Sequence, residues 1–170
     1  MVTIERRALL VTIGKQFNMT WTFREGATKT ELEIAFWWYD GMVKFLKTND
    51  SWQKQDLGEF IRQLESNVLY TGFIDGVFSG LVQGEEKSKD VVEGHLFTNV
   101  DDLDFLTMLI TYAKNRALTK YQYVVTQTPV KHKTMLGLNL RAGFYDSAIK
   151  SWSSVHKGRL VTIQHNIASR

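Results

Sequence analysis

The segment from Val91 to Phe144 alternates between two side-chain periods, and this alternation limits the possible folds more than any other feature of the chain. Val91–Thr98 is short and rich in β-branched and aromatic residues, which predicts a strand. Asn99–Leu118 has apolar residues at spacings of three and four, and aspartates in its first turn, which predicts a helix. Tyr121–Thr128 predicts a second strand and Thr134–Ala142 a second, short helix. Two strands joined through a helix of this length are expected to be parallel neighbours in one sheet.

The residues before this segment predict two candidate strands followed by two helices. Met1–Ile13 and the alternating residues around Trp21 have the composition of strands. Thr30–Glu33 has the spacing of a capping box, in which a threonine and a glutamate close the start of a helix, and an apolar stripe follows it. Asp56–Glu59 repeats this pattern and predicts the second helix.

The first of these helices contains four consecutive aromatic residues, Phe36–Tyr39. They cannot all face one core, because neighbouring residues of a helix point about 100° apart. One or two of them are therefore candidates for a groove or a partner interface. The alternative is that other parts of the chain bury all four.

Two further pairs of strands are expected to be antiparallel. Leu69–Ile74 and Val77–Gln83 flank Asp75-Gly76, a dipeptide that favours a two-residue type I′ turn. Ala148–Ser154 and Leu160–Ile167 predict a final pair near the end of the sequence. Together with the helices, these strands predict an α/β chain.

The composition is that of one intracellular domain. A chain of 170 residues with 44% hydrophobic content can bury one substantial core, and no break in composition marks a linker. Residues 1–170 are therefore expected to form a single domain. The sequence has no cysteine, which excludes disulfides and thiolate metal sites and favours an intracellular location. No apolar run reaches membrane-spanning length, and the dispersed histidines and aspartates match no metal-binding motif.

Charge is distributed unevenly along the chain. Residues 114–170 contain ten Lys or Arg and one acidic residue, whereas residues 1–113 contain eleven and seventeen. A basic C-terminal third suits an anionic ligand or partner, such as an acidic protein or a nucleic acid, and the alternative is a solvated strand surface. The candidate partner-binding residues lie around the short helix and on the final strand pair: Lys131, Lys133, Arg141, Lys150, Lys157 and Arg159.

The order of the expected elements resembles the fold of the GNAT family of N-acetyltransferases from end to end. The local resemblance is greatest in HKTMLGLNLRAGF, residues 132–144, which is similar to the motif of that family's fourth helix. Leu138, Arg141, Gly143 and Phe144 match the motif by type. The resemblance implies a mixed central sheet with helices on both faces.

For function, the resemblance implies transfer of an acetyl group from acetyl-coenzyme A to an amine. In such a fold the cofactor lies between the two parallel strands, which are expected to splay apart beyond Thr98. The implied cofactor-binding residues are Leu96, Phe97 and Thr98, whose backbone would pair with the pantetheine arm, and His132, at a position where the family often has asparagine. Asn139 stands where the family often has a tyrosine that protonates the departing thiolate.

The loop that binds pyrophosphate in that family lacks its usual glycines in this chain. The corresponding residues, Thr98–Asp104, read TNVDDLD, with carboxylates crowded at the start of the expected helix. Amides at a helix start attract phosphate, and these carboxylates repel it. One pair of unit charges at about 6 Å is worth almost 3 kcal/mol at an effective dielectric of about 20. Acetyl-coenzyme A is therefore expected to bind weakly or not at all.

Glu93 and His95 are the candidate catalytic residues. They lie two residues apart on the strand expected to hold the cofactor, so their side chains share one face. Acyl transfer to an amine needs a base that removes the proton of the amine, and either residue can serve. The alternative is a structural role, with His95 hydrogen-bonded beneath the helices and Glu93 in solvent.

Two functions are compatible with the sequence. One is a divergent N-acyltransferase that depends on acetyl-coenzyme A. The other is a catalytically silent scaffold of the same fold that binds an acidic protein or a nucleic acid through its basic third. The chain is also similar to the short, divergent GNAT proteins that bacteriophages encode, which would allow a virion-associated location.

Overall fold

The structure, a computed structural model, describes residues 1–8, 17–46, 56–155 and 159–170. In these ranges the chain forms eight strands and four helices. The strands are β1 (Val2–Ala8), β2 (Phe17–Glu25), β3 (Val68–Ile74), β4 (Val77–Ser88), β5 (Val91–Thr98), β6 (Tyr123–Pro129), β7 (Tyr145–Val155) and β8 (Arg159–Ser169). The helices are α1 (Lys29–Leu46), α2 (Leu57–Glu65), α3 (Leu103–Ala117) and α4 (Lys133–Arg141).

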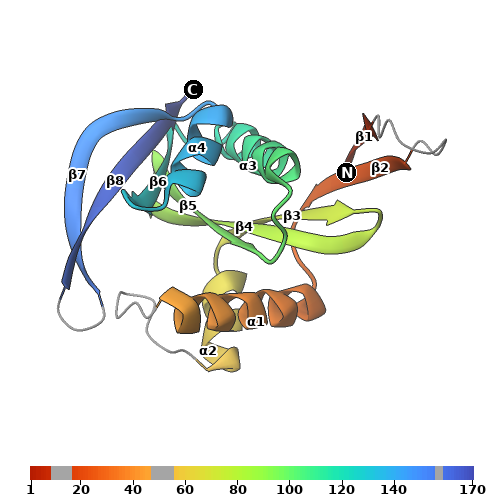
Figure 1. Cartoon of the computed structure of the whole chain (residues 1–170), viewed down its shortest axis with the longest axis horizontal. Coiled ribbons are helices and arrows are strands. Elements are labelled where there is room, and N and C mark those ends of the chain that lie inside the picture. Colours follow the sequence, from red (N-terminus) through yellow and green to blue (C-terminus); the bar gives the residue numbers. More distant parts are fainter. Residues whose placement is uncertain (9–16, 47–55, 156–158) are drawn as a thin grey trace.

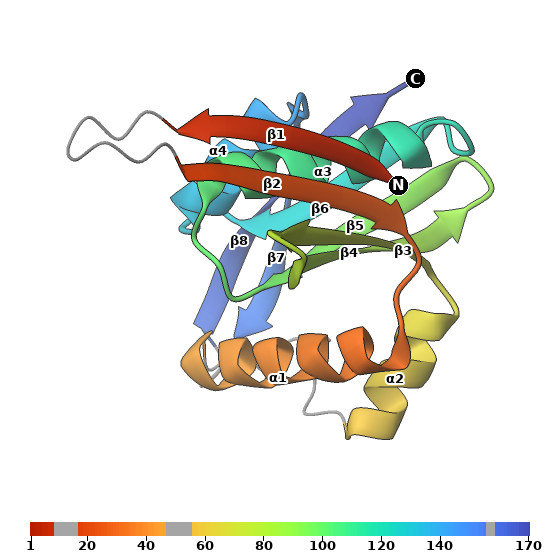
Figure 2. The ribbon, with the colours of Figure 1, turned by 90° about the vertical axis from the view of Figure 1, so that its right-hand side faces the viewer.

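The described strands form one mixed sheet in the order β1-β2-β3-β4-β5-β6-β8-β7. Neighbouring strands are antiparallel except β5 and β6, which are parallel. Figure 1 shows α3 and α4 on one face of the sheet and α1 and α2 on the other, and Figure 2 shows the same separation from the side. The prediction of a mixed sheet with helices on both faces is confirmed, and so is that of two parallel neighbours.

Each face of the sheet has its own apolar core. On one face, α3 packs Phe105 and Leu109 against the central strands. The approach is close at Gly80, where an added Cβ would lie 2.6 Å from Leu109 Cδ2. On the other face, α1 and α2 pack against β4 and β5, with the rings of Phe60 and Phe97 edge to face at 5.6 Å. The two helical layers thus hold β4 and β5 between them.

β5 and β6 are paired over only a short length. The last pair of their parallel register joins Glu93 to Val125. Beyond it, β6 is paired with β8 and β5 with β4, so each strand follows the twist of its other neighbour. The strands therefore part after Glu93, and the prediction that they part beyond Thr98 is wrong.

The start of α1 also differs from the prediction. The capping box consists of Thr28 and Glu31 instead of Thr30 and Glu33. The amide of Thr28 donates to Glu31 Oε2 at 2.7 Å, and the amide of Glu31 donates to Thr28 Oγ1 at 3.3 Å. Arg24 of β2 pairs with the same Glu31 carboxylate, and this contact between elements favours the earlier box.

Three other local predictions hold where the structure describes the chain, whereas the helix expected from Asn99 begins at Leu103. Asp56 Oδ1 accepts the amide of Glu59 at 2.8 Å, which confirms the second cap. Asp75 and Gly76 have φ of 49° and 80°, as a type I′ turn requires. The first candidate strand is confirmed as far as Ala8, and residues 9–13 lie outside the described ranges.

None of the described helices is both long and apolar enough to cross a membrane.

The four consecutive aromatic residues of α1 have different surroundings. Phe36 and Tyr39 are buried, and Trp38 stacks on Phe78 with ring centroids 4.9 Å apart. Trp37 is 65% exposed. Most of this run is therefore packed within the chain, and a role in a partner interface stays a prediction for Trp37.

Candidate functional site

Glu93 and His95 lie on β5 beside the point where it parts from β6. Their side chains face α1 and α2, because they alternate with Val92 and Leu96, which pack in the α3 core. Glu93 is only 5% exposed, and its Oε2 accepts a hydrogen bond from Gln127 Nε2 of β6 at 3.2 Å. Glu93 is therefore a buried carboxylate that spans the gap between the two strands, and it is not the solvated side chain of the alternative interpretation.

Glu93 and His95 belong to a cluster of charged side chains across β4 and β5. In the register of these strands Glu85 lies opposite Glu93, and Gln83 lies opposite His95. His95 Nε2 is 3.4 Å from Glu85 Oε2 and 3.8 Å from Glu93 Oε1. Lys87 Nζ is 2.8 Å from Glu85 Oε1 and 3.4 Å from Glu93 Oε2. The amine of Lys87 and the imidazole of His95 thus each lie within 4 Å of both carboxyl groups.

The cluster sets the charge of its members. Burial lowers the pKa of His95 despite the nearby carboxyl groups, so its imidazole is neutral at pH 7. A hydrogen bond from Lys87 lowers the pKa of Glu85. Burial by itself would lower the pKa of Lys87, but the hydrogen bonds and charges of Glu85 and Glu93 outweigh it and raise this pKa. Lys87 is therefore an ammonium ion paired with carboxylate, beside a neutral imidazole.

Three members of the site, Glu85, Lys87 and Gln127, were not predicted from the sequence. The strand expected to end at Gln83 continues to Ser88, because the polar residues after Gln83 pair with β5. A signal for this extension is the alternation of polar residues at 83, 85 and 87, which matches the alternation at 93 and 95 across a short hairpin.

Leu96, Phe97 and Thr98 lie on β5 beyond the parting point. Their backbone is paired with β4 on one edge, and the described register with β6 does not extend to them. The side chain of Phe97 is buried in the α1 and α2 core, and Leu96 packs in the α3 core. Thr98 Oγ1 donates to the carbonyl of Ser79 at 2.8 Å. The backbone groups of residues 94–98 that face β6 can therefore pair with an extended ligand.

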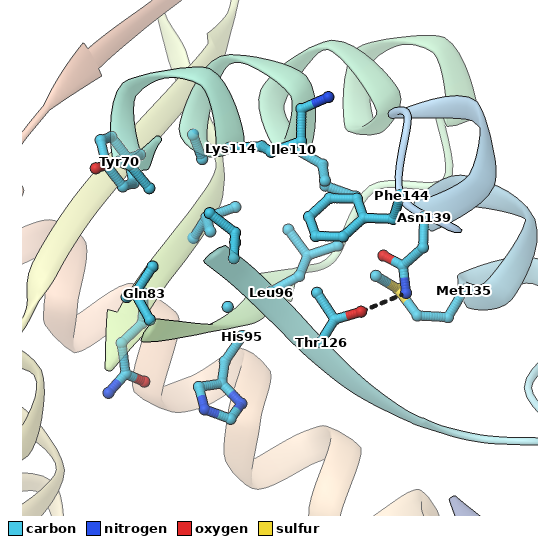
Figure 3. A pocket seen from close by; sticks show the side chains of 17 residues that line it. Tyr70, Gln83, His95, Leu96, Ile110, Lys114, Thr126, Met135, Asn139 and Phe144 are labelled. Carbon is cyan, nitrogen blue, oxygen red and sulfur yellow. Dashed lines mark hydrogen bonds between the residues drawn. The ribbon is translucent and has the colours of Figure 1, made fainter. Parts of the chain in front are cut away.

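A small cavity lies beneath α3 and α4, and its lining includes Gln83 and His95, whose side chains point away from α3 (Figure 3). Its volume of about 40 Å³ is enough for water. Asn139 lines it, fully buried, and its Nδ2 donates to Thr126 Oγ1 at 3.0 Å and to Thr128 Oγ1 at 3.3 Å. Among the described residues Asn139 Oδ1 has no hydrogen-bond partner. An amide carries no acidic hydroxyl, so Asn139 cannot act as the acid that the family's tyrosine provides.

His132 lies at the N-cap position of α4 and makes no side-chain capping bond. Burial, with a smaller effect of the charge of Lys131, lowers its pKa. It is not one of the residues that line the cavity. Its role in cofactor binding therefore stays a prediction.

An acidic side chain closes the first turn of α3. Asp102 Oδ1 accepts hydrogen bonds from the amide of Asp104 at 3.1 Å and from the amide of Phe105 at 3.0 Å. Asp104 in turn pairs with Arg141 of α4. Two amides at this helix start are thus engaged by the chain itself.

The candidate partner-binding residues are described only in part. The side chains of Lys131, Lys133 and Lys150 are exposed. Arg141 is also exposed, and its ion pair with α3 neutralises part of its charge. Lys157 lies outside the described residues, and Arg159 is placed on β8 without a described side chain. Their joint role in binding stays a prediction.

Comparison with solved structures finds a similar fold in acetyltransferases. A phosphinothricin acetyltransferase from Sinorhizobium meliloti, in complex with AcCoA, has a TM-score of 0.74 at 12% identity over 88% of this chain and 88% of that chain. A spermidine N-acetyltransferase from Vibrio cholerae, in complex with CoA and spermine, has a TM-score of 0.71 at 13% identity over 88% and 95%. A ribosomal-protein-alanine N-acetyltransferase from Brucella melitensis has a TM-score of 0.69 at 15% identity over 88% and 99%. No protein-family model matches the sequence, and no curated protein sequence matches it either.

The chain thus has a mixed α/β fold of the class in which two parallel strands part between helical layers. More particularly, it has the GNAT fold, as the resemblance in the sequence predicted. At these identities the likeness shows the fold alone.

Proposed function

We propose that this protein is an acyltransferase that moves an acyl group from a thioester donor to an amine, coenzyme A being the donor that the fold implies. The observation that carries the proposal is the position of Glu93. Its buried carboxyl group lies where the parallel strands part, beside a neutral imidazole. A base at this place can reach an amine that approaches from the side of α1 and α2.

In this proposal Glu93 accepts the proton that the amine must lose before it can attack. Gln127 donates to Glu93 Oε2 and so fixes the orientation of the carboxyl group. His95 Nε2 lies 3.8 Å from Glu93 Oε1 and 3.4 Å from Glu85 Oε2. One ring nitrogen can therefore receive the proton from Glu93 and release it towards Glu85, which is the more exposed of the two carboxyl groups.

The chain offers a suitable site for the pantetheine arm of coenzyme A but not for its pyrophosphate. When bound, this donor would supply the acyl group as an activated thioester. The backbone of residues 94–98 suits the amides of a pantetheine arm, because an extended chain can pair with a strand edge. The start of α3 does not suit pyrophosphate, because Asp102 already accepts two of its amides and carries charge of the same sign. The proposal therefore includes weak binding of acetyl-coenzyme A, held through its arm and not through its nucleotide.

Acyl transfer itself tests the proposal. The purified protein, incubated with acetyl-coenzyme A and a panel of primary amines, should release free thiol and form an acetylated amine that mass spectrometry detects. Glu93→Gln removes the base with little change of shape and should lower the rate by about a hundredfold. Glu59→Gln changes an exposed carboxylate of α2 and serves as the matched control, with an unchanged rate. Absence of transfer by the wild type to every amine of the panel would contradict the proposal.

A second candidate is the catalytically silent scaffold. The carboxylate at the start of α3 and the amide of Asn139 in place of an acidic hydroxyl are compatible with it. Lys131 and Lys133, exposed and without an ion pair in the described ranges, would then bind an acidic protein or a nucleic acid. The two candidates differ in donor binding, since the scaffold would bind no thioester.

A further inference from the structure

Lys87 has no part in the proton transfer proposed above, yet its amine lies at the centre of the site. Its Nζ is 2.8 Å from Glu85 Oε1 and 3.4 Å from Glu93 Oε2. The register of β4 and β5 shifts between Glu86 and Ser88, and a bulge of this kind redirects a side chain. Because Glu93 is the proposed base, the amine of Lys87 lies where an acceptor amine must come to lose its proton.

The clustered side chains become progressively more buried from one end of the site to the other. The side chains of Lys87 and Glu85 are 41% and 34% exposed, whereas those of His95 and Glu93 are 18% and 6% exposed. The site is therefore open at Lys87 and closed at Glu93. An unbranched alkyl chain that ends in an ammonium group can follow the path of the lysine stem and reach the buried carboxyl group.

Gln83 provides an independent indication of a ligand. It is 1% exposed, and among the described residues neither its Oε1 nor its Nε2 has a hydrogen-bond partner. Buried amides without partners are rare because burial removes their hydrogen bonds to water. Gln83 lies opposite His95 in the register, and Figure 3 shows both side chains on the side of the strands away from α3. Its Oε1 is therefore an acceptor beside the site that Lys87 leaves without a partner.

We propose that Gln83, Glu85, Glu93 and His95 form a binding site for the primary ammonium group of a linear alkylamine, which Lys87 fills when no ligand is bound. A primary ammonium group has three N–H donors; the two carboxyl groups accept from it as they do from Lys87, and the Gln83 amide beside them offers an acceptor that Lys87 does not use. A quaternary ammonium group has the same charge but no N–H donor. The identity of this ligand as the acyl acceptor rests on the proposed function, whereas its binding does not.

Binding can be measured without any acyl donor, by NMR titration of the full chain with n-butylamine, whose stem has the length of a lysine stem. Lys87→Met removes the internal ammonium and keeps an unbranched side chain. If Lys87 fills the site for about nine-tenths of the time, its removal tightens the apparent binding of butylamine about tenfold. Lys89→Met changes an exposed lysine in the following turn and is the matched control, which should bind butylamine as the wild type does. Tetramethylammonium should bind none of these proteins at the site.

Equal affinities of the wild type and Lys87→Met for butylamine would overturn the proposal, and so would equal binding of tetramethylammonium. If Lys87→Met does not fold, the wild type decides. Saturating butylamine should then shift the resonances of the Lys87 side chain and the His95 ring but not those of Lys89, and unshifted resonances overturn the proposal. Failure of the proposed function is a distinct result, because a protein that releases no thiol from acetyl-coenzyme A can still pass these binding tests.

Discussion

Asp102 has two roles at the start of α3, since it carries a negative charge and caps the helix by accepting hydrogen bonds. Its replacement by serine removes the first role and keeps the second. In the wild type, Asp102 Oδ1 accepts the amides of Asp104 and Phe105 at 3.1 Å and 3.0 Å. Serine is a comparably good N-cap residue, so Asp102→Ser keeps an acceptor for the first turn and removes one negative charge. The variant should therefore fold, with a melting temperature close to that of the wild type by circular dichroism.

The size of the effect on cofactor binding follows from Coulomb's law. A phosphate at the start of α3 would lie about 6 Å from the Asp102 carboxylate, where two unit charges repel by almost 3 kcal/mol at an effective dielectric of about 20. Asp102 is only half-buried, so water and salt screen the repulsion and about 1 kcal/mol remains. Acetyl-coenzyme A should therefore bind Asp102→Ser about fivefold more tightly than it binds the wild type.

Calorimetry at low salt measures this ratio. Acetyl-pantetheine, which has no pyrophosphate, should bind the wild type and Asp102→Ser equally. Asp101→Ser removes an exposed carboxylate next to the cap and is the matched control, with a smaller gain because exposed charges are screened more strongly. The electrostatic reasoning is refuted if Asp102→Ser gains no affinity for acetyl-coenzyme A, or if the wild type already binds it with a dissociation constant of about a few micromolar.

Three further predictions concern the core, the titration of the site and the basic residues. Gly80→Ala should lower the free energy of unfolding by about 1–3 kcal/mol, because its Cβ would lie 2.6 Å from Leu109 Cδ2. Gly41→Ala, on α1 with no described atom within 4 Å of the new Cβ, should raise it by about 1 kcal/mol, and urea denaturation that ranks the two variants otherwise would contradict the packing. Because burial lowers the pKa of His95, the stability from its neutral form is complete above the unfolded value of 6.5 and is lost as the pH falls towards the lower folded pKa. Urea denaturation at a series of pH values should show this loss in the wild type and a smaller one in His95→Gln, and identical profiles would argue against a buried neutral imidazole. Lys131→Glu combined with Lys133→Glu should leave thermal stability unchanged and weaken capture of an acidic partner mainly at low salt, whereas unchanged capture at every salt concentration would exclude these lysines from the interface.

The strand and helix at the centre of the sequence interpretation were predictable because their signals are local. Val91–Thr98 is β5 with the predicted bounds, and the predicted stripe of α3 is buried from Leu106 to Ala117, whereas its first residue, Leu103, is 42% exposed. In both elements, successive residues of one face lie two to four positions apart in the sequence. Alternation and helical spacing therefore contain the information that decides which side chains are buried.

The point where β5 and β6 part depends on contacts that the local pattern does not contain. β6 leaves β5 after Val125 while it stays paired with β8, whose residues lie far along the sequence. The cap of α1 has the same explanation, because Arg24 pairs with Glu31 across two elements. Contacts between distant parts of the sequence thus decide where β5 and β6 part and where α1 begins, and the local composition predicted both positions wrongly.

Two of the five members of the candidate site were predicted from the sequence. Glu93 and His95 could be chosen because they alternate on one strand, and the structure places them on one face. Their partners Glu85 and Lys87 required the register of β4 with β5, including the shift after Glu86. A polar run of this composition is also typical of a loop, so sequence alone does not show that it extends a strand.

Binding of a thioester between β5 and β6 through its pantetheine arm is the claim on which the proposed function depends most. Calorimetric titration of the wild type with acetyl-pantetheine and with acetyl-coenzyme A tests it directly. We predict measurable binding of both donors, with dissociation constants within about threefold of each other, because the nucleotide adds little at the start of α3. Binding of acetyl-coenzyme A about a hundredfold more tightly than acetyl-pantetheine, or binding of neither donor, would contradict the claim.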